Sequence, residues 1–380
     1  MNMNRSAAFL VVVAPVLAAA IGGCADAQPA RDGIVTEPRP MLSVSRDAQI
    51  TLFGELPDRS DVPFFSRGAT SMLRHTFAEE GADFDPHVDA SGERLVFAST
   101  RHTIRPDLYI KNVDGTAVTQ LTADPSSDVQ PAFSPDGQWV AFASDRGGNW
   151  DIWVVSVEGT QPMQVTRGPE DDVHPSWSPD GKQVVFCSLP RSGGQWEMWI
   201  ADAVAGGTKS FIGYGVFPEW SPAGDRIAYQ RARQRGSRWF SVWTIEMVQG
   251  EPRHPTEVAA SPEYALITPS WSADGQMLAY CAVTTAPLTD PDFASAMEVA
   301  DLWTVSADGR SRVCLTDGHT ANYGPVWSSS GRIFFTSTRD GHENIWSLQP
   351  GTGSPADAPS EKELISRQTA PARKSAVNDS

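Results

Sequence analysis

The chain has 380 residues, of which 40% are hydrophobic, and carries a formal net charge of −16. Nucleic acid and anionic lipid headgroups would repel such an acidic chain, so neither is expected as its main partner. This length fits either two or three average domains or one large all-β domain.

The N-terminus has the pattern of an export signal. A single basic residue, Arg5, precedes an apolar run over 7–20 that is too short to span a bilayer. The run ends in Ile-Gly-Gly-Cys at 21–24, which resembles the bacterial lipobox. We therefore expect 1–23 to be a lipoprotein signal peptide and Cys24 to carry the acyl chains that hold the protein on a membrane. An ordinary cleaved signal with a chance cysteine is the alternative.

The residue after the cysteine bears on which membrane is used. By the same resemblance, Ala25 in place of Asp favours sorting to the outer membrane, so we expect a lipoprotein that faces the periplasm.

The other three cysteines, Cys187, Cys281 and Cys314, lie in apolar strand patterns. Their odd number precludes a fully paired disulfide framework, and no metal-binding spacing is present, so we expect buried free thiols.

A repeat dominates the rest of the chain. A proline, one residue, an apolar or aromatic residue and a glycine turn recur six times, with starts spaced 43 to 56 residues apart at Pro86, Pro131, Pro175, Pro218, Pro269 and Pro325. This period is typical of a four-stranded propeller blade. The clearest copies, at 131–137 and 175–181, contain the tight-turn sequence Ser-Pro-Asp-Gly.

Each repeat predicts four strands, here named a to d from the axis outward. Strand a carries the proline, and strand b is an alternating apolar segment after the Asp-Gly turn. Strand c centres on sequences such as Asp-Ile-Trp at 151–153, and strand d ends in Leu-Thr or Val-Thr. We therefore predict an all-β fold, a six-bladed β-propeller of four-stranded antiparallel blades. Nine of the 13 tryptophans recur on strands a and c, which favours positions in the packing between blades.

The repeat also sets domain boundaries. Residues 24–40 read as a flexible tether, 41–69 have no assignment, 70–366 form the propeller, and 367–380 form a disordered tail. The segment that ends at Phe77 matches an outer strand without a blade of its own. We predict that it completes the sixth blade and closes the ring. Residues 363–366 are the competing candidate for that position.

With Ser-Pro-Asp-Gly, Asp-Ile-Trp and Leu-Thr in register, residues 70–350 resemble the WD-like β-propellers of the TolB-like family. The resemblance implies a six-bladed propeller in the bacterial envelope. The chain departs from TolB in its predicted lipid anchor and in the unassigned stretch at 41–69 where TolB has an α/β domain. The bridging role that TolB plays between envelope proteins is therefore implied only weakly.

Strand order places the d-to-a and b-to-c connections on one face, which carries the variable loops and is the expected recognition face. An acidic ring stands there three residues before the repeat proline, at Asp83, Asp128 and Asp172, with Gly215, Leu266 and Asn322 completing it. Asp85 and His174 lie in the same rim. Oxygen-rich rings suit Ca²⁺ or another cation, and TolB-like relatives imply a cation in the channel. Capping of local backbone N–H groups is the alternative, and we favour it for these aspartates.

Arginines recur in the b-to-c loops, where one per blade predicts pairing with the acidic rim of neighbouring blades. Blade four carries more arginines than such pairing requires, namely Arg231, Arg233, Arg235 and Arg238. This loop is therefore the candidate site for an anionic glycan, a carboxylate or an acidic envelope protein. Long insertions at 251–266 and 282–300 would overhang one sector of the channel mouth.

No motif of an esterase elbow, a zincin helix or a phosphate-binding loop occurs in the sequence. We therefore predict a non-catalytic binding scaffold, a monomer that needs no cofactor and reaches the membrane only through its anchor. The alternative is a metal-dependent polysaccharide lyase or hydrolase that uses the rim, where His87, His174 and His319 could converge as they do in propeller lyases.

Overall fold

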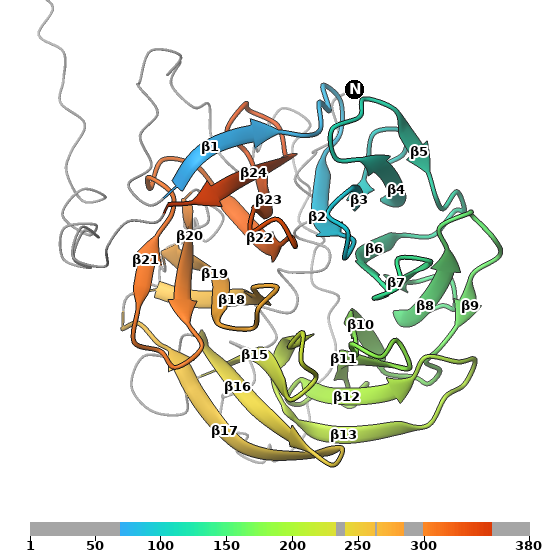
Figure 1. Cartoon of the computed structure of the whole chain (residues 1–380). Helices are drawn as coiled ribbons and strands as arrows, with labels where there is room; N and C mark the ends of the chain where they lie inside the picture. Colours follow the sequence, from blue (N-terminus) through green and yellow to red (C-terminus); the bar gives the residue numbers. More distant parts are fainter. Residues whose placement is uncertain (1–68, 233–239, 263, 285–298, 352–380) are drawn as a thin grey trace, which may run out of the picture.

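The computed structural model describes residues 69–232, 240–262, 264–284 and 299–351. These residues form six four-stranded antiparallel sheets around a common axis, so the predicted six-bladed β-propeller is confirmed (Figure 1). In every blade the strand nearest the axis is followed outward by the next strands in chain order, apart from the outermost strand of blade 6.

Blades 1 to 3 take consecutive strands. They are β2 (Asp83–Val88), β3 (Arg94–Ser99), β4 (Asp107–Asn112) and β5 (Val118–Gln120); β6 (Asp128–Phe133), β7 (Trp139–Ser144), β8 (Asp151–Ser156) and β9 (Met163–Gln164); and β10 (Asp171–Trp177), β11 (Gln183–Leu189), β12 (Glu197–Asp202) and β13 (Lys209–Tyr214).

Blades 4 to 6 keep the same scheme. They are β14 (Val216–Trp220), β15 (Arg226–Ala232), β16 (Phe240–Val248) and β17 (Glu251–Ala259); β18 (Tyr264–Trp271), β19 (Met277–Thr284), β20 (Ala300–Ser306) and β21 (Arg312–Cys314); and β22 (Asn322–Trp327), β23 (Ile333–Ser337) and β24 (Asn344–Pro350), completed by β1 (Ala69–Arg74).

The ring closes by pairing its first strand with its last. β1 lies antiparallel to β24, so the predicted closure by the segment before Phe77 is confirmed. Two buried side chains reinforce this joint. The Asn344 side-chain oxygen accepts hydrogen bonds from Ala78 N and Thr76 Oγ1, and Thr76 Oγ1 accepts one from Ile345 N. Closure satisfies backbone groups that would otherwise form an open sheet edge.

Apolar residues of the middle strands fill the space between blades. Leu95, Phe142, Phe186 and Ile227 lie on strand b of successive blades and have no accessible surface. The strand a tryptophans pack against this core, as the repeat predicted. Two of them also donate a hydrogen bond across a blade junction, Trp177 Nε1 to the Ala132 carbonyl at 3.0 Å and Trp271 Nε1 to the Glu219 carbonyl at 3.3 Å. Large flat rings bury much apolar area between two sheets while keeping one polar group satisfied.

The three internal cysteines lie in this core. Cys187, Cys281 and Cys314 are free and buried, as predicted. Burial raises the pKa of the Cys187 thiol to about 12, so it stays protonated at neutral pH.

Within the described ranges, no helix has the length and apolar character that crossing a membrane would need. The predicted signal peptide, Cys24, the tether, residues 363–366 and the tail lie outside the described residues.

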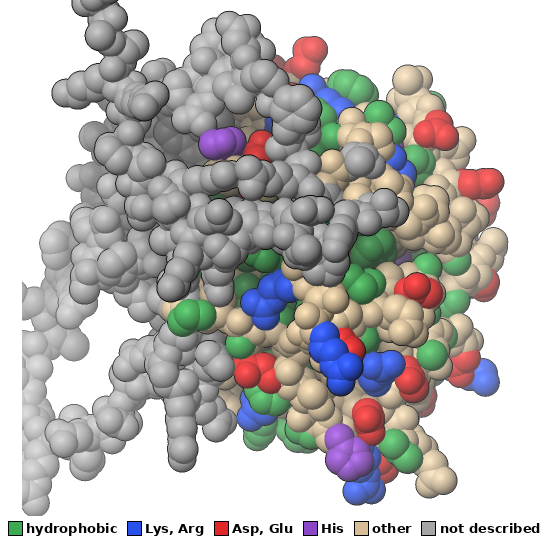
Figure 2. All heavy atoms as spheres, turned by 60° about the vertical axis from the view of Figure 1, so that its left-hand side comes forward, with side chains coloured by type: hydrophobic (Ala, Val, Ile, Leu, Met, Phe, Trp, Pro, Cys, Tyr) green, Lys and Arg blue, Asp and Glu red, His purple; other side chains and the backbone are tan. Residues whose placement is uncertain are grey.

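The outer rim of the ring carries charges of both signs. Figure 2 shows acidic and basic side chains interspersed on the side of the molecule that includes β21. Described ion pairs of this kind, such as Arg310–Asp308 at 3.5 Å, join exposed side chains. Exposed pairs contribute little to stability because water screens them, so the ring depends mainly on its closure and its core.

This account of ring closure predicts a loss of stability when one of the hydrogen bonds at the joint is removed. Thr76→Val keeps the side-chain shape but removes the acceptor for Ile345 N, which would then be buried without a partner. We expect the free energy of unfolding to fall by about 1–3 kcal/mol, measured by urea denaturation. The matched control, Thr119→Val on exposed β5, should change it by less than about 0.5 kcal/mol. Equal effects of the two changes would contradict this account of closure.

Candidate functional site

The innermost strand of every blade contains a bulge at the repeat proline. The pairing register of strand a with strand b shifts there in all six blades, for example between Phe84 and His87 and between Val129 and Ala132. Strand a is the inner edge of its sheet, and proline has no N–H to donate to a neighbouring strand. A bulge on an edge strand is one of the few places in a sheet that tolerates proline.

The residue before each proline adopts a positive φ. The angles lie between 50° and 60° at Asp85, Gln130, His174, Phe217, Thr268 and Gly324. Five of these six residues are not glycine, although this backbone region is unfavourable for residues with a Cβ, and most of all for a β-branched one. The same strained geometry, repeated around the axis, aims five side chains and the backbone of Gly324 at the same space.

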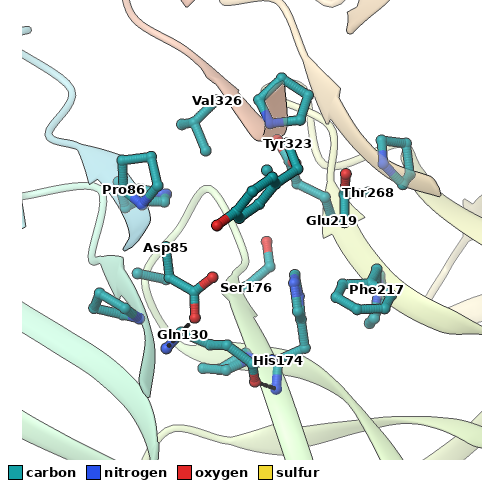
Figure 3. A pocket seen from close by; sticks show the side chains of 18 residues that line it. Asp85, Pro86, Gln130, His174, Ser176, Phe217, Glu219, Thr268, Tyr323 and Val326 are labelled. Atoms are coloured by element: carbon teal, nitrogen blue, oxygen red, sulfur yellow. Dashed lines mark hydrogen bonds between the residues drawn. The ribbon is translucent and has the colours of Figure 1, made fainter. Parts of the chain in front are cut away.

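That space is a cavity on the propeller axis. Its walls are the residues on both sides of the six prolines, and its volume is about 90 Å³. Figure 3 shows the Asp85, His174 and Tyr323 side chains pointing into it from different blades. By the volume that each water takes in the liquid, roughly 30 Å³, the cavity accommodates about three waters or one small chemical group.

Side chains of one blade hold the bulge of the next. Asp85 Oδ2 accepts from Gln130 N at 3.3 Å, and Gln130 Oε1 accepts from His174 N at 2.9 Å (Figure 3). In the same way, Gln230 Oε1 accepts from Thr268 N at 2.8 Å. These bonds satisfy the amides at the strained positions, so the cavity wall is rigid and preorganised.

Side chains one residue after four of the prolines make a second set of contacts to the next blade. His87 Nδ1 accepts from Phe133 N, and Glu219 Oε1 accepts from Trp271 N and from the Ser270 hydroxyl. These side chains therefore join neighbouring blades next to the cavity.

Burial shifts the pKa values of the channel groups towards their neutral forms. It raises the pKa of Asp85 to about 7 and that of Glu219 to about 8, and lowers the pKa of His87 to about 4 and that of His174 to about 3. At neutral pH the two histidines are uncharged, and Glu219 is mainly protonated.

A further acid lies behind the channel wall. Burial raises the pKa of Glu343 to about 7, and its side chain hydrogen-bonds the Tyr323 hydroxyl, with Asp85 near enough to disfavour a second negative charge. Like charges in one low-dielectric space cannot easily coexist. The Asp85 charge therefore adds to burial in raising the pKa of Glu343.

Two atoms of the cavity wall are unsatisfied. Among the described residues, His174 Nδ1 and Thr268 Oγ1 are buried and have no hydrogen-bond partner in the protein. His174 instead packs edge-on against Phe217, with ring centroids 4.2 Å apart. Buried polar atoms in native proteins nearly always have partners, so the two unpaired atoms make this wall a candidate place for a polar group of a ligand.

The acidic ring predicted three residues before the prolines is a set of structural contacts inside each blade. Arg101 Nη2 lies 2.9 Å from both carboxylate oxygens of Asp83. Arg146 Nη2 lies 2.7 Å from Asp128 Oδ2. Each of these carboxylates is also tied to a serine at the end of strand b. They face their own hairpins and not a common centre.

Blade 3 departs from this scheme. Ser188 Oγ donates to Asp172 Oδ1 at 2.5 Å, and Asp172 Oδ2 has no hydrogen-bond partner among the described residues. Pro190 takes the place of the arginine found two residues after the serine in blades 1 and 2. In the part of the chain that the structure describes, no group of three or more His, Cys, Asp or Glu side chains could hold a metal ion. A channel cation stays a prediction.

The other members of the predicted ring are also structural. Asn322 Oδ1 accepts from Ser337 Oγ, and its Nδ2 donates to the carbonyls of Ala300 and Thr320. In blade 4 the position is Gly215, where a Cβ would lie 2.4 Å from the Tyr229 ring. A close approach of backbone to ring therefore excludes aspartate at this point.

The arginine prediction needs a correction. Arg101 and Arg146 pair with aspartates of their own blades and not, as expected, mainly with neighbouring ones, because the hairpin places them directly above strand a. Arg146, Arg231 and Arg339 also lie over the strand c tryptophan of their own blade, at 5.1–5.4 Å. Arg105–Asp145, at 3.3 Å, is an example of the expected pairing between blades.

The remaining predicted residues fall into two groups. Asp85, His87 and His174 do line one cavity, while His319 is exposed and is not part of its wall. Arg231 is described, whereas Arg233, Arg235, Arg238 and most of the 282–300 insertion lie outside the described residues.

Sequence reasoning missed most of the channel wall. Gln130, Phe217, Thr268, Glu219 and Tyr323 were not singled out, because their residue types differ from blade to blade. The proline itself was the available signal: the position directly before it recurs six times, and it is there that an edge-strand bulge turns a side chain inward.

Comparison with known proteins agrees with this architecture. Residues 56–243 match the family model of the TolB beta propeller domain. An uncharacterized protein of Agrobacterium fabrum is 34% identical over 110 residues, which are 29% of this chain and 32% of that protein. The matched stretch thus spans about a third of that relative.

Solved structures share the fold at low identity. A TolB from Agrobacterium tumefaciens has a TM-score of 0.54 and 19% identity, covering 70% of this chain and 90% of its own. TolB from Acinetobacter baumannii has a TM-score of 0.50 and 22% identity, covering 64% and 56%. An oligogalacturonate lyase in complex with manganese has a TM-score of 0.50 and 14% identity, covering 76% and 96%. At these identities the likeness concerns the fold alone.

The strained bulges predict an unusual substitution effect. Thr268 is β-branched and has a φ of 50°, so Thr268→Gly should relieve strain and raise the free energy of unfolding by about 1 kcal/mol. The control, Thr119→Gly in strand β5, should lower it, since glycine weakens an ordinary strand. Urea denaturation measures both, and a loss of stability in Thr268→Gly would contradict the strain.

The channel acids predict a pH dependence. Between pH 6.5 and 8 the folded protein retains protons that the unfolded chain has released, since burial raises the Glu219 pKa from 4.5 to about 8. Asp85 and Glu343 contribute in the lower half of this window, because burial raises their pKa values to about 7. Stability should therefore fall as pH rises through this window. Glu219→Gln should reduce the slope by about one proton, measured by urea denaturation at several pH values. The exposed control Glu158→Gln should leave the slope unchanged, and an unchanged slope in Glu219→Gln would contradict the assignment.

Proposed function

Because this chain carries a six-bladed β-propeller of the TolB-like kind, we propose that it acts as a non-catalytic binding scaffold in the bacterial envelope. The binding site is the channel together with the loops around its mouth. The channel receives one small polar group of the partner, and the surrounding loops contact the rest of it.

One observation carries this proposal: five residues with side chains accept a positive φ in order to point into one cavity. Strained backbone positions persist where the surrounding structure enforces them, and they cluster at binding and active sites. The inter-blade bonds at Gln130 and His174 provide that enforcement. The propeller fold requires the bulges but does not require particular side chains at them. The different side chains found at these positions therefore favour a role in recognising a ligand.

The size of the cavity decides what can enter. A volume of about 90 Å³ is well below the roughly 300–1,000 Å³ of a pocket that encloses a drug-sized ligand. A sugar chain would not fit inside, whereas a single side chain or a chain terminus of a protein partner would. His174 Nδ1 and Thr268 Oγ1 are positioned to hydrogen-bond such a group.

The loops around the mouth supply charge for the rest of the interface. Arg231 of blade 4 stacks on Trp243 at 5.4 Å, and three more arginines follow it in the sequence. Arginine on an aromatic ring is a frequent anchor of protein interfaces. An acidic segment of an envelope protein is therefore the partner we propose, with an anionic glycan as the alternative ligand.

The anchoring is proposed from the sequence. The lipobox-like segment at 21–24 supports acylation of Cys24, which would place the propeller at the periplasmic side of the outer membrane. Metabolic labelling with a radioactive fatty acid tests it: Cys24→Ser should lose the label and move to the soluble fraction. Labelling that persists in this variant would refute the anchor.

A metal-dependent polysaccharide lyase or hydrolase is the second candidate. Its support is that His87 and His174 line the same cavity and that Asp85 and Glu219 have pKa values near neutrality, as general acids and bases do. The geometry favours binding because hydrogen bonds to the neighbouring blade occupy Glu219 Oε1 and His87 Nδ1.

The test of the binding proposal compares the channel with an outer surface. After cross-linking in cells, His174→Asn should recover at least about fivefold less of the captured envelope protein than wild type, since each lost buried contact weakens binding by this order. Asparagine is chosen because it tolerates a positive φ. His254→Asn on the exposed strand β17 is the control and should recover as much as wild type.

Quantitative mass spectrometry of the captured proteins is the measurement. Unchanged recovery with His174→Asn would contradict the channel as the site. Cleavage of polygalacturonate in the presence of Mn²⁺, lost in the same variant, would instead favour the lyase.

A further inference from the structure

A second hollow lies away from the channel, where blades 2 and 3 meet on the face of the a-to-b turns. Its volume is about 600 Å³, and its walls include Trp139, Trp177, Asp136 and Asp180. This volume is within the range of small-ligand and peptide pockets. The hollow shares no wall residue with the channel cavity, so a ligand bound here is independent of the proposed function.

Two other blade junctions contain an arginine at the equivalent place. The first residue of strand b is Arg94 in blade 1 and Arg226 in blade 4. Each guanidinium lies 5.4 Å from the centre of the aromatic ring that ends strand a of the next blade, over Phe133 and Trp271 respectively. Arg94 also donates to the Gly137 carbonyl at 2.8 Å. The junction thus forms a slot in which an arginine covers an aromatic face.

Each of these arginines has a carboxylate from its own turn beside it. Asp89 lies 2.8 Å from Arg94 Nε, and Asp225 lies 3.5 Å from Arg226 Nε. The slot therefore combines an aromatic face of one blade with an acidic group of the preceding one. Both features attract a guanidinium.

Between blades 2 and 3 the slot is present but its arginine is missing. The first residue of strand b is Trp139, which is 42% exposed, and the ring that ends strand a of blade 3 is Trp177. This turn also carries a carboxylate, Asp136, although at a different position of the turn from Asp89 and Asp225, and the next turn adds Asp180. Hydrogen bonds from Ser134 and Ser178 lower the pKa values of these two acids, so both stay charged.

We propose that this groove binds an arginine side chain presented by a peptide segment of a partner protein. The guanidinium takes the position that Arg94 and Arg226 occupy in their own junctions, over Trp177 and near Asp136. Trp139 forms the opposite wall. The net charge of −16 adds a long-range attraction for a basic segment. Lys182 Nζ, 3.6 Å from Asp180 Oδ2, is 80% exposed and does not close the groove.

The test uses a defined probe and the tryptophan indole signals. Protein labelled with ¹⁵N-tryptophan is titrated with N-acetyl-Gly-Arg-Gly-amide and with the same peptide containing citrulline, the neutral isostere of arginine. The Trp139 and Trp177 indole signals should shift with the arginine peptide, and the citrulline peptide should bind about tenfold more weakly. Added salt should weaken the arginine peptide more than its isostere.

Two variants separate the groove from general charge effects. Trp139→Arg places here the arginine found in blades 1 and 4, so the chain should fill its own slot and lose binding of the peptide. Gln183→Arg introduces the same charge at the first residue of strand b in blade 3, beside the next junction, and should keep most of the binding. Thermal unfolding checks that both variants fold.

Three results would overturn the proposal. They are equal binding of the citrulline peptide, unchanged affinity in Trp139→Arg, and no shift of either indole signal at millimolar peptide. A response of the same two signals to maltohexaose, without any to the arginine peptide, would reassign the groove to carbohydrate and likewise overturn it.

Discussion

The bulge at the repeat proline is the constraint on which the rest of this propeller depends. Proline cannot donate to a sheet, and it occurs six times on the strand nearest the axis. The strand accommodates it by a shift of register, which turns the preceding residue into the channel at a positive φ. The inner edge of each blade thus stops pairing where the blades converge. A cavity with six independent wall residues is the consequence.

The two faces of the ring result from this arrangement in different ways. On the channel side, hydrogen bonds pass from one blade to the next through Asp85, Gln130 and Glu219, so the cavity wall belongs to the ring as a whole. On the opposite face the junctions are local, and each contains whatever residues its own two blades supply. Arg94 fills one junction and Trp139 leaves another hollow. One repeat therefore produces a shared site on the axis and separate sites between blades.

Acidic side chains at the start of strand a and in the channel have different roles in this molecule. The aspartates that start strand a are held within their own hairpins by arginine or serine, and Arg101 and Arg146 in turn cover a strand c ring, Tyr109 or Trp153. Burial raises the pKa values of Asp128 and Asp172 as well, although Arg146 opposes it at Asp128. The channel acids have no such counter-ion, and burial raises the pKa of Asp85 to about 7 and that of Glu219 to about 8. The same side-chain type is thus a structural ion partner at the start of strand a and a titratable group two residues later.

The sequence by itself determined the number of blades, their strand order and the closure by β1, because these follow from periodicity and turn chemistry that every repeat carries. It also indicated Asp85, His87 and His174 as rim residues. Only the tertiary structure decided that Asp83 and Asp128 are held by Arg101 and Arg146, and that Gln130, Phe217 and Thr268 form the channel. The physical reason is that a bulge moves a side chain from one face of a strand to another. Its direction depends on the register with strand b, which the local sequence does not encode. The hollow at Trp139 needed the structure for a similar reason, since it arises from two residues of different blades that meet only in the closed ring.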